Sequence, residues 1–199
     1  GLEVRIVGES GTDAEEGVPG ELWVRRAGSD PRYGFFSGYY KDEAATAAAW
    51  ESGWFHTGDS VRRGADGCLF FVDRLKNIIR RSGENIAAVE VESVLMQCPQ
   101  ARACAVTAVP DDVRGEEVFA FIVSDRDYER AEAVSLQQHC QQSLVYFKAP
   151  GYIAFVRELP QTASQKVARG EVKRLAAQYL LNGKAHDLRD GKRQRGFHG

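Results

Sequence analysis

The sequence lacks the features that would mark it as a nucleic-acid-binding or membrane-spanning protein. It carries 26 basic and 28 acidic side chains, so its net charge of −2 gives no general attraction to nucleic acid or anionic lipid. No apolar run reaches the length of a transmembrane helix, and the first residues show no basic-then-apolar leader pattern. We therefore expect no nucleic-acid partner and no integral membrane segment, and we predict a cytoplasmic location.

The sequence also lacks the cysteine patterns of a metal site or a disulfide framework. The four cysteines, Cys68, Cys98, Cys104 and Cys140, form no C-x-x-C pair, and no Cys/His group has the spacing of a zinc site. This pattern favours separate reduced thiols, and we expect no metal held by the protein's own side chains.

The apolar residues that are present predict two kinds of structure in one chain. Alternating patterns at residues 2–7 and 21–25 predict strands, and an alanine-rich stretch at 41–49 predicts a short helix. Beyond residue 73, helical patterns are interspersed with apolar runs that are typical of strands. The helical patterns cover residues 88–97, 134–145 and 171–181, and the strand patterns cover residues 103–109, 118–123 and 152–156.

The fold class we expect is therefore α+β. Residues 1–73 form the end of a β-rich N-terminal subdomain, and residues 74–182 form a small α+β domain. Residues 183–199 combine basic side chains and glycines with almost no apolar residues, which predicts a disordered tail.

Three short motifs could carry chemistry. Residues 53–59 read GWFHTGD and end in Asp59, an acceptor-only carboxylate that suits the two hydroxyls of a ribose. Residues 73–79 read DRLKNII, and Arg74 offers a planar fork of donors. Residues 159–166 read LPQTASQK and end in Lys166. Taken singly, each has a plain alternative as a surface turn, a solvated arginine or a loop lysine.

In this order and combination, the motifs resemble those of the AMP-forming acyl-CoA synthetases of the adenylate-forming superfamily. The resemblance covers residues 1 to about 180 and is to the C-terminal part of such enzymes. It implies ATP with Mg²⁺ and coenzyme A as cofactors, a carboxylic acid substrate and an upstream N-terminal domain as partner. The reaction would form an acyl-adenylate and then a thioester.

The resemblance also implies a role for each site residue. Asp59 would bind the adenylate ribose and Arg74 would contact the nucleotide, while Lys76 would be the hinge between the domains. Gly83, in a loop that we expect between a strand and a helix, would border the path of the pantetheine thiol. His56 is interpreted as structural, packed near Trp54, since adenylation needs no general base.

Lys166 is the expected catalytic residue. Activation brings the substrate carboxylate and the α-phosphate together, and an ammonium group between them offsets their repulsion. Two unit charges at ~4 Å contribute about 4 kcal/mol at an effective dielectric near 20, which could supply up to about a thousandfold in rate.

Two departures from the family pattern limit what the chain can do. Gln165 stands where the family usually has glycine before the lysine, and glutamine restricts the backbone more than glycine does. The Ser/Thr/Gly-rich loop that would cradle a triphosphate does not occur in these residues. We expect this chain alone to be incompetent in adenylation.

Two other interpretations stay open. The motifs also fit an adenylation domain of a peptide synthetase, which would pass the acyl group to a carrier protein. A non-catalytic module that binds a nucleotide or a partner is the alternative from another class. The acid that would be activated cannot be derived from these residues.

Overall fold

The computed structural model describes residues 1–126 and 128–192, and these form two compact units. The first unit is Gly1–Lys76 and the second begins at Asn77. The division falls three residues beyond the boundary predicted between residues 73 and 74. The mixed α+β fold class is confirmed.

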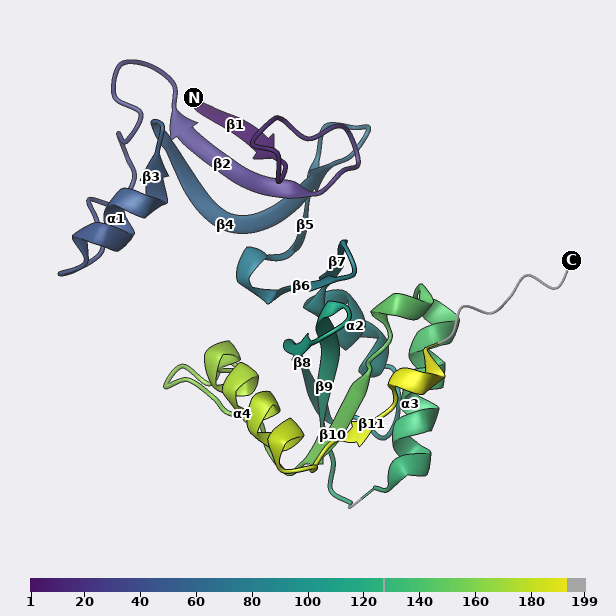
Figure 1. The fold of residues 1–199 in the computed structure, drawn as a ribbon. Helices are drawn as coiled ribbons and strands as arrows, with labels where there is room; N and C mark the ends of the chain where they lie inside the picture. The colour runs from purple at the N-terminus through teal and green to yellow at the C-terminus, as the bar shows by residue number, and fades with distance from the viewer. Residues whose placement is uncertain (127, 193–199) are drawn as a thin grey trace, which may run out of the picture. The chain divides into compact units, whose positions relative to one another are not determined.

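The first unit is an antiparallel sheet with one short helix (Figure 1). The strand order is β1-β2-β4-β3, and β5 also pairs with β4. The bounds are Leu2–Val7 for β1, Gly20–Arg26 for β2, Trp50–Glu51 for β3, Trp54–Arg63 for β4 and Leu69–Arg74 for β5. Helix α1, Glu43–Ala49, begins where the Asp42 carboxylate accepts a hydrogen bond from the backbone N–H of Ala45 at 2.9 Å.

One face of this sheet is built from stacked arginine and tryptophan side chains. The Arg25 guanidinium lies 4.2 Å from the ring centroid of Trp54, and the Arg5 guanidinium lies 5.5 Å from that of Trp23. Cation–π contacts of this kind each contribute about 0.5–1 kcal/mol at exposed sites. They stabilise a face that has few buried aliphatic side chains.

The second unit is a six-stranded mixed sheet of order β11-β10-β9-β6-β7, in which β8 also pairs with β9. Strands β9 and β10 run parallel and the other pairs run antiparallel. The strands are Ile78–Arg81 (β6), Glu84–Ala87 (β7), Ala103–Asp111 (β8), Gly115–Val123 (β9), Tyr152–Val156 (β10) and His186–Asp187 (β11). The helices are Ala88–Leu95 (α2), Arg130–Ser143 (α3) and Arg169–Leu181 (α4), and single 3₁₀ turns cover Tyr146–Lys148 and Arg189–Gly191. Another 3₁₀ turn, Leu75–Asn77, contains the division between the two units.

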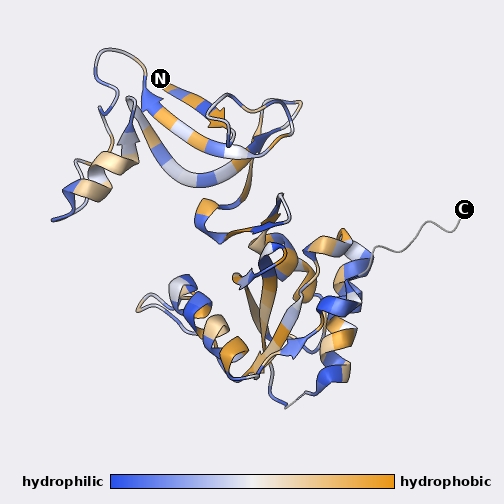
Figure 2. Ribbon diagram, viewed as in Figure 1, coloured by the Kyte–Doolittle hydropathy of each residue, from blue (hydrophilic) through white to orange (hydrophobic). Residues whose placement is uncertain are grey.

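Helices cover both faces of this sheet. Side chains of α2 and α3 pack in one apolar cluster with Val118, Ala120 and Ile122 of β9. Side chains of α4 pack in another with Phe119 and Phe121 of the same strand. Strand β9 therefore reads as a continuous apolar run, which Figure 2 shows as orange ribbon in the middle of the sheet.

The predicted elements need three corrections. Helix α3 begins at Arg130 and not near residue 134, because Glu129 and Glu132 form a reciprocal capping box at its start. The segment around Gly83 is not a loop between a strand and a helix. It is a two-residue turn between β6 and β7, and β7 leads directly into α2.

The third correction concerns the predicted disordered tail. Residues 184–192, which we call the C-terminal strap, pack on the second unit, and Leu188 and Lys192 are buried. Within the strap, β11 pairs antiparallel with β10 at Tyr152–Asp187 and Ile153–His186. The strap is held by backbone pairing and by specific polar contacts, which apolar composition does not reveal. The rest of the predicted tail, residues 193–199, lies outside the described residues.

Candidate functional site

Asp59 and Arg74 lie opposite each other on β4 and β5. Asp59 Oδ1 is 2.7 Å from Arg74 Nε, and Arg74 Nη1 donates a hydrogen bond to the carbonyl of Thr57 at 3.1 Å. The Asp59–Arg74 contact is an ion pair at short distance, although no donor within the described residues is aligned with Oδ1 as a hydrogen bond. The Arg74 side chain is 53% exposed and that of Asp59 is 27% exposed, so both can meet a ligand.

A bulge in β4 shapes the segment that carries Asp59. The pairing of β2 with β4 shifts register after Glu21, and Gly58 adopts a positive φ of 70° there. Glu21 Oε1 accepts a hydrogen bond from the Gly58 N–H at 3.0 Å, and Thr57 Oγ1 donates to the Leu22 carbonyl at 2.7 Å. Sequence reasoning missed Glu21, because its partner lies 37 residues away and no local pattern connects the two.

Lys76 lies in the 3₁₀ turn Leu75–Asn77 and is exposed. It is the last residue of the first unit, so the predicted hinge residue and the observed division coincide in the chain. Its neighbour Asp73 is buried and accepts a hydrogen bond from the Arg74 N–H at 2.7 Å.

Gly83 lies in the turn between β6 and β7. Ser82 and Gly83 both have positive φ, 52° and 83°, as the central residues of a type I′ turn require. A Cβ atom built on Gly83 would meet no atom within 4 Å, so the turn is open on that side. Ser82 carries the conformational strain that a residue with a side chain has in this region.

Lys166 ends a tight loop that precedes α4. The backbone of Thr162 pairs with that of Lys166 through a 2.8 Å hydrogen bond, and Gln165 N–H donates to the Thr162 carbonyl at 2.9 Å. Gln165 has a φ of +61°, the left-handed region that favours glycine. Glutamine at residue 165, where the family usually has glycine, is therefore a strained residue. The Lys166 side chain is exposed.

An arginine anchors the base of this loop. The guanidinium of Arg169, the first residue of α4, pairs with the Glu92 carboxylate of α2 through contacts of 2.5 and 2.8 Å. Glu92 Oε1 also accepts a hydrogen bond from the Val106 N–H at 2.7 Å. This bidentate pair connects α4 with α2 and β8, so Lys166 stands three residues before a fixed point.

The structure brings together Asp59 and Arg74 of the predicted set. Within the described part of the second unit, Gly83 and Lys166 lie in separate turns, one between β6 and β7 and the other before α4. His56 contacts Trp23 with ring centroids 4.1 Å apart, and its Nδ1 lies 3.6 Å from Glu21 Oε2. Trp23 is opposite His56 in the β2–β4 register, and the expected packing of His56 near Trp54 stays a prediction.

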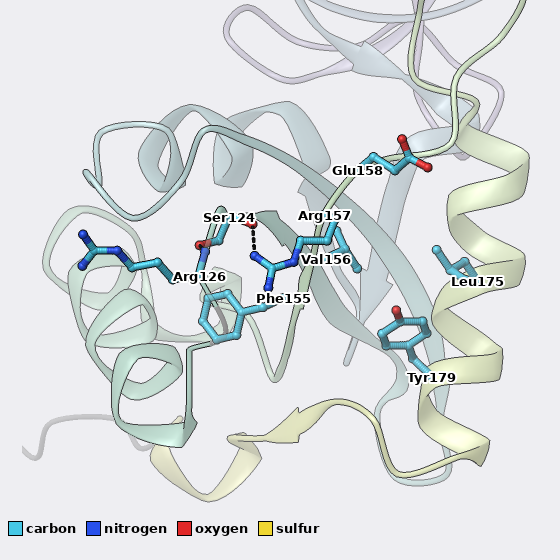
Figure 3. Close-up of a pocket in the computed structure, with 8 residues that line it drawn as sticks. All are labelled: Ser124, Arg126, Phe155, Val156, Arg157, Glu158, Leu175 and Tyr179. Atoms are coloured by element: carbon cyan, nitrogen blue, oxygen red, sulfur yellow. Dashed lines mark hydrogen bonds between the residues drawn. The ribbon is translucent and has the colours of Figure 1, made fainter.

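A separate pocket of about 310 Å³ lies where β9 and β10 end. Its lining includes Arg157, whose Nη1 donates to the Ser124 carbonyl at 3.3 Å, and the aromatic rings of Phe155 and Tyr179 (Figure 3). Figure 3 shows the Arg126 side chain pointing away from these rings. None of the predicted site residues lines this pocket.

Over residues 1–126 and 128–192, no group of His, Cys, Asp and Glu side chains is arranged to hold a metal ion. None of the helices in this part of the chain is long and apolar enough to cross a membrane.

Comparison with known proteins gives the family. Residues 90–166 match the model of the AMP-binding enzyme C-terminal domain. The chain belongs to the AMP-binding enzyme family. Crotonobetaine/carnitine–CoA ligase of Proteus mirabilis is 34% identical over 168 residues, which are 84% of this chain and 32% of that enzyme.

Further relatives agree with this assignment. Feruloyl-CoA synthase of an Amycolatopsis species is 38% identical over 86% of this chain and 34% of the enzyme. The solved structure of o-succinylbenzoate CoA synthetase from Bacillus subtilis, with its acyl-adenylate intermediate, superposes with a TM-score of 0.73 at 30% identity, covering 86% of this chain and 34% of that one. The chain thus spans about a third of the length of the AMP-binding enzymes that it matches.

Proposed function

We propose that this chain is the C-terminal portion of an ATP-dependent carboxylic acid:CoA ligase. The matched relatives are acyl-CoA ligases and synthetases, and the observation that carries the proposal to particular residues is the Asp59–Arg74 pair. A carboxylate and a guanidinium 2.7 Å apart, both partly exposed, present an acceptor and a planar set of donors side by side. The hydroxyls of a ribose can donate to the carboxylate, and the phosphate attached to that ribose can accept from the guanidinium.

In this proposal the Asp59 carboxylate accepts a hydrogen bond from each of the two ribose hydroxyls, and Arg74 donates hydrogen bonds to the nucleotide. The left-handed Gly58 lets the backbone of the bulge approach the sugar without a Cβ atom in the way. Glu21 is a positioning residue, because it holds the Gly58 N–H from the neighbouring strand.

Lys166 is the proposed catalytic residue of the first half-reaction. Its ammonium group offsets the repulsion between the substrate carboxylate and the α-phosphate and stabilises charge that moves onto pyrophosphate. Mg²⁺ would be bound mainly by the phosphate oxygens of ATP, as its preference for oxygen ligands favours. The exposure of Lys166 in a loop anchored by Arg169 is consistent with a side chain that reaches another part of the enzyme.

The second half-reaction is proposed to use another part of the second unit, the turn between β6 and β7. The two units divide at Lys76. A change of backbone angles there would rotate the second unit, so that the turn of Gly83 replaces the loop of Lys166 at the site of the reaction. Gly83 leaves room on its open side for the pantetheine thiol of coenzyme A. The segments that would bind adenine, triphosphate and acyl group are absent from the 199 residues, so we propose that this chain alone does not adenylate an acid.

The test is complementation. The separately expressed upstream portion of the parent enzyme is mixed with this chain, and pyrophosphate release is followed over a panel of fatty and aromatic acids. We expect activity only on mixing, with a loss of up to about a thousandfold in Lys166→Ala. Lys184→Ala is the matched control, because Lys184 is also an exposed lysine and lies near the Tyr179 ring.

The proposal is wrong for Lys166 if mixed activity is the same in Lys166→Ala and in the control. Activity of this chain without its upstream portion would refute the proposed incompetence.

A further inference from the structure

A cluster of charged side chains is buried in the second unit, away from the site residues. The side chains of Glu117 on β9 and Lys192 in the strap have no exposed surface, and that of Arg81 on β6 is 3% exposed. Lys192 Nζ lies 2.5 Å from Glu117 Oε1, and Arg81 Nε donates to Glu117 Oε2 at 2.8 Å. One buried carboxylate is therefore shared by two cations from segments far apart in the sequence.

Arg81 leads directly into the turn that contains Gly83. It is paired with Gly115 in the register of β6 and β9. The next residue, Ser82, donates its backbone N–H to the Arg114 carbonyl at 2.9 Å. The turn is thus held against the start of β9, next to the residue that Lys192 contacts.

A second cation of the strap reaches the same region. Arg189 Nη1 lies 3.0 Å from Asp111 Oδ2, and its guanidinium lies 5.0 Å from the ring centroid of Tyr152. The other oxygen of Asp111 accepts hydrogen bonds from the N–H groups of Val113 and Arg114. The strap therefore contacts the β8–β9 hairpin at its tip through Arg189 and on β9 through Lys192.

The path of the strap is fixed by buried polar contacts. Gln137 of α3 donates to the carbonyls of Pro150 and Leu188 at 2.7 and 2.8 Å. The strap approaches this side chain so closely that a Cβ atom on Gly191 would lie 2.4 Å from its oxygen. These contacts place Lys192 in register with Glu117.

We propose that the C-terminal strap is a latch for the Ser82–Gly83 turn, and that Lys192 is its positioning residue. Lys192 occupies one oxygen of Glu117 and so leaves the other aligned with Arg81. Without the ammonium group, the Val118 N–H is the one hydrogen-bond donor that the described residues still offer Glu117 Oε1. The buried carboxylate then turns toward entering water, and Arg81 loses its fixed acceptor.

The charges around Glu117 come from three elements. Arg81 faces it from β6 and Lys192 from the strap, and Arg114 of the β8–β9 turn acts on the same group of charges. Burial lowers the pKa of Lys192 to about 8, and the neighbouring cations add to that effect.

Hydrogen exchange of the whole chain tests the latch. The amides of Arg80 and Ser82 are followed, because they donate to Glu116 and to the Arg114 carbonyl across the contact with β9. We expect Lys192→Met, which keeps the apolar stem, to speed their exchange on the order of tenfold. Lys184→Met, at an exposed position of the same strap, should leave them unchanged. Lys192→Ala serves as a second variant with the same expected direction.

Three results would overturn the latch. Unchanged exchange of Arg80 and Ser82 in both Lys192 variants would show that the turn does not depend on the strap. An equal increase in the β9 amides of residues 119–122 would mean that Lys192 supports the whole unit and not the turn. Failure of both variants to fold would show the same, because local release of the turn leaves the rest of the sheet paired.

The consequence for catalysis rests on the proposed function. In the complemented enzyme, Lys192→Met should slow thioester formation and leave pyrophosphate release unchanged. Faster hydrogen exchange of the Arg80 and Ser82 amides with no effect on thioester formation would support the latch. The same result would refute the proposed role of Gly83. The two failures are therefore distinguishable.

Discussion

Raising the pH from 7 to 10 should stabilise the second unit through Lys192. In the folded chain its pKa is lowered to about 8, mainly by desolvation, whereas in an unfolded chain it has the ordinary value of 10.5. Between these values the unfolded chain binds more protons than the folded chain, so the free energy of unfolding rises with pH. Below pH 8 both states are protonated and this group contributes no pH dependence.

The magnitude follows from the two pKa values. Their difference corresponds to about 3 kcal/mol in the limit of high pH, and most of it is reached by pH 10. No reduction for solvent screening applies, because the Lys192 side chain has no exposed surface. The direction is opposite to that of a surface lysine in an ion pair, since desolvation of this buried ammonium group outweighs its attraction to Glu117.

Urea unfolding at several pH values gives the measurement. Far-ultraviolet circular dichroism follows mainly the second unit, which contains α2, α3 and α4. Tryptophan fluorescence follows the first unit, because Trp23, Trp50 and Trp54 all lie there. The difference between wild type and Lys192→Met isolates the lysine from other titrating groups. It should grow by about 2–3 kcal/mol from pH 8 to pH 10, and parallel pH profiles of the two proteins would refute the reasoning.

Three further changes test other parts of the structure. Gln165→Gly should remove the strain of a left-handed residue and raise the free energy of unfolding by up to about 1 kcal/mol, visible in thermal unfolding; a loss of stability would contradict this. Glu92→Gln should lower that free energy by about 1 kcal/mol in urea, because Arg169 keeps its partly buried position without its anion, and an unchanged midpoint would argue against the anchor. Cys68 is exposed and should react quickly with a thiol reagent, whereas Cys104 is partly buried and has a pKa raised to about 12 mainly by that burial, so it should react far more slowly; equal labelling rates of the two in native protein would contradict this.

Local sequence patterns predicted the strands and helices that bury apolar faces. Strand Tyr152–Val156 has the predicted bounds, because Gly151 and Arg157 bound its short apolar run on the two sides. The start of α3 was misplaced, since the capping residue Glu129 is not among the residue types that usually begin a helix. The turn at Ser82 and Gly83 was predicted as a loop, because serine at positive φ has no clear signal in sequence.

Candidate site residues could be predicted only where they belong to a motif of residues that are close together in the sequence. Residues 53–59 and 73–79 gave Asp59 and Arg74, and the structure pairs them across β4 and β5. The supporting residues were not found, because they depend on tertiary contacts between distant segments. Lys192 and Glu117 are 75 residues apart, and nothing in a glycine-rich basic stretch indicates that one of its lysines is buried. The assigned roles of all five site residues stay predictions; these residues are Asp59, Arg74, Lys76, Gly83 and Lys166.

The strap also determines when the protein can finish folding during synthesis. The first unit is built from contacts within residues 1–76, so its sheet can form early in translation. In the second unit, Glu117 is made long before the lysine that completes its surroundings. Until residue 192 has left the ribosome, the growing chain holds a carboxylate that lacks one of its cations in the middle of a nascent sheet. A nascent chain stalled before residue 192 has emerged should therefore be cut by proteases at the Ser82–Gly83 turn more readily than the released protein.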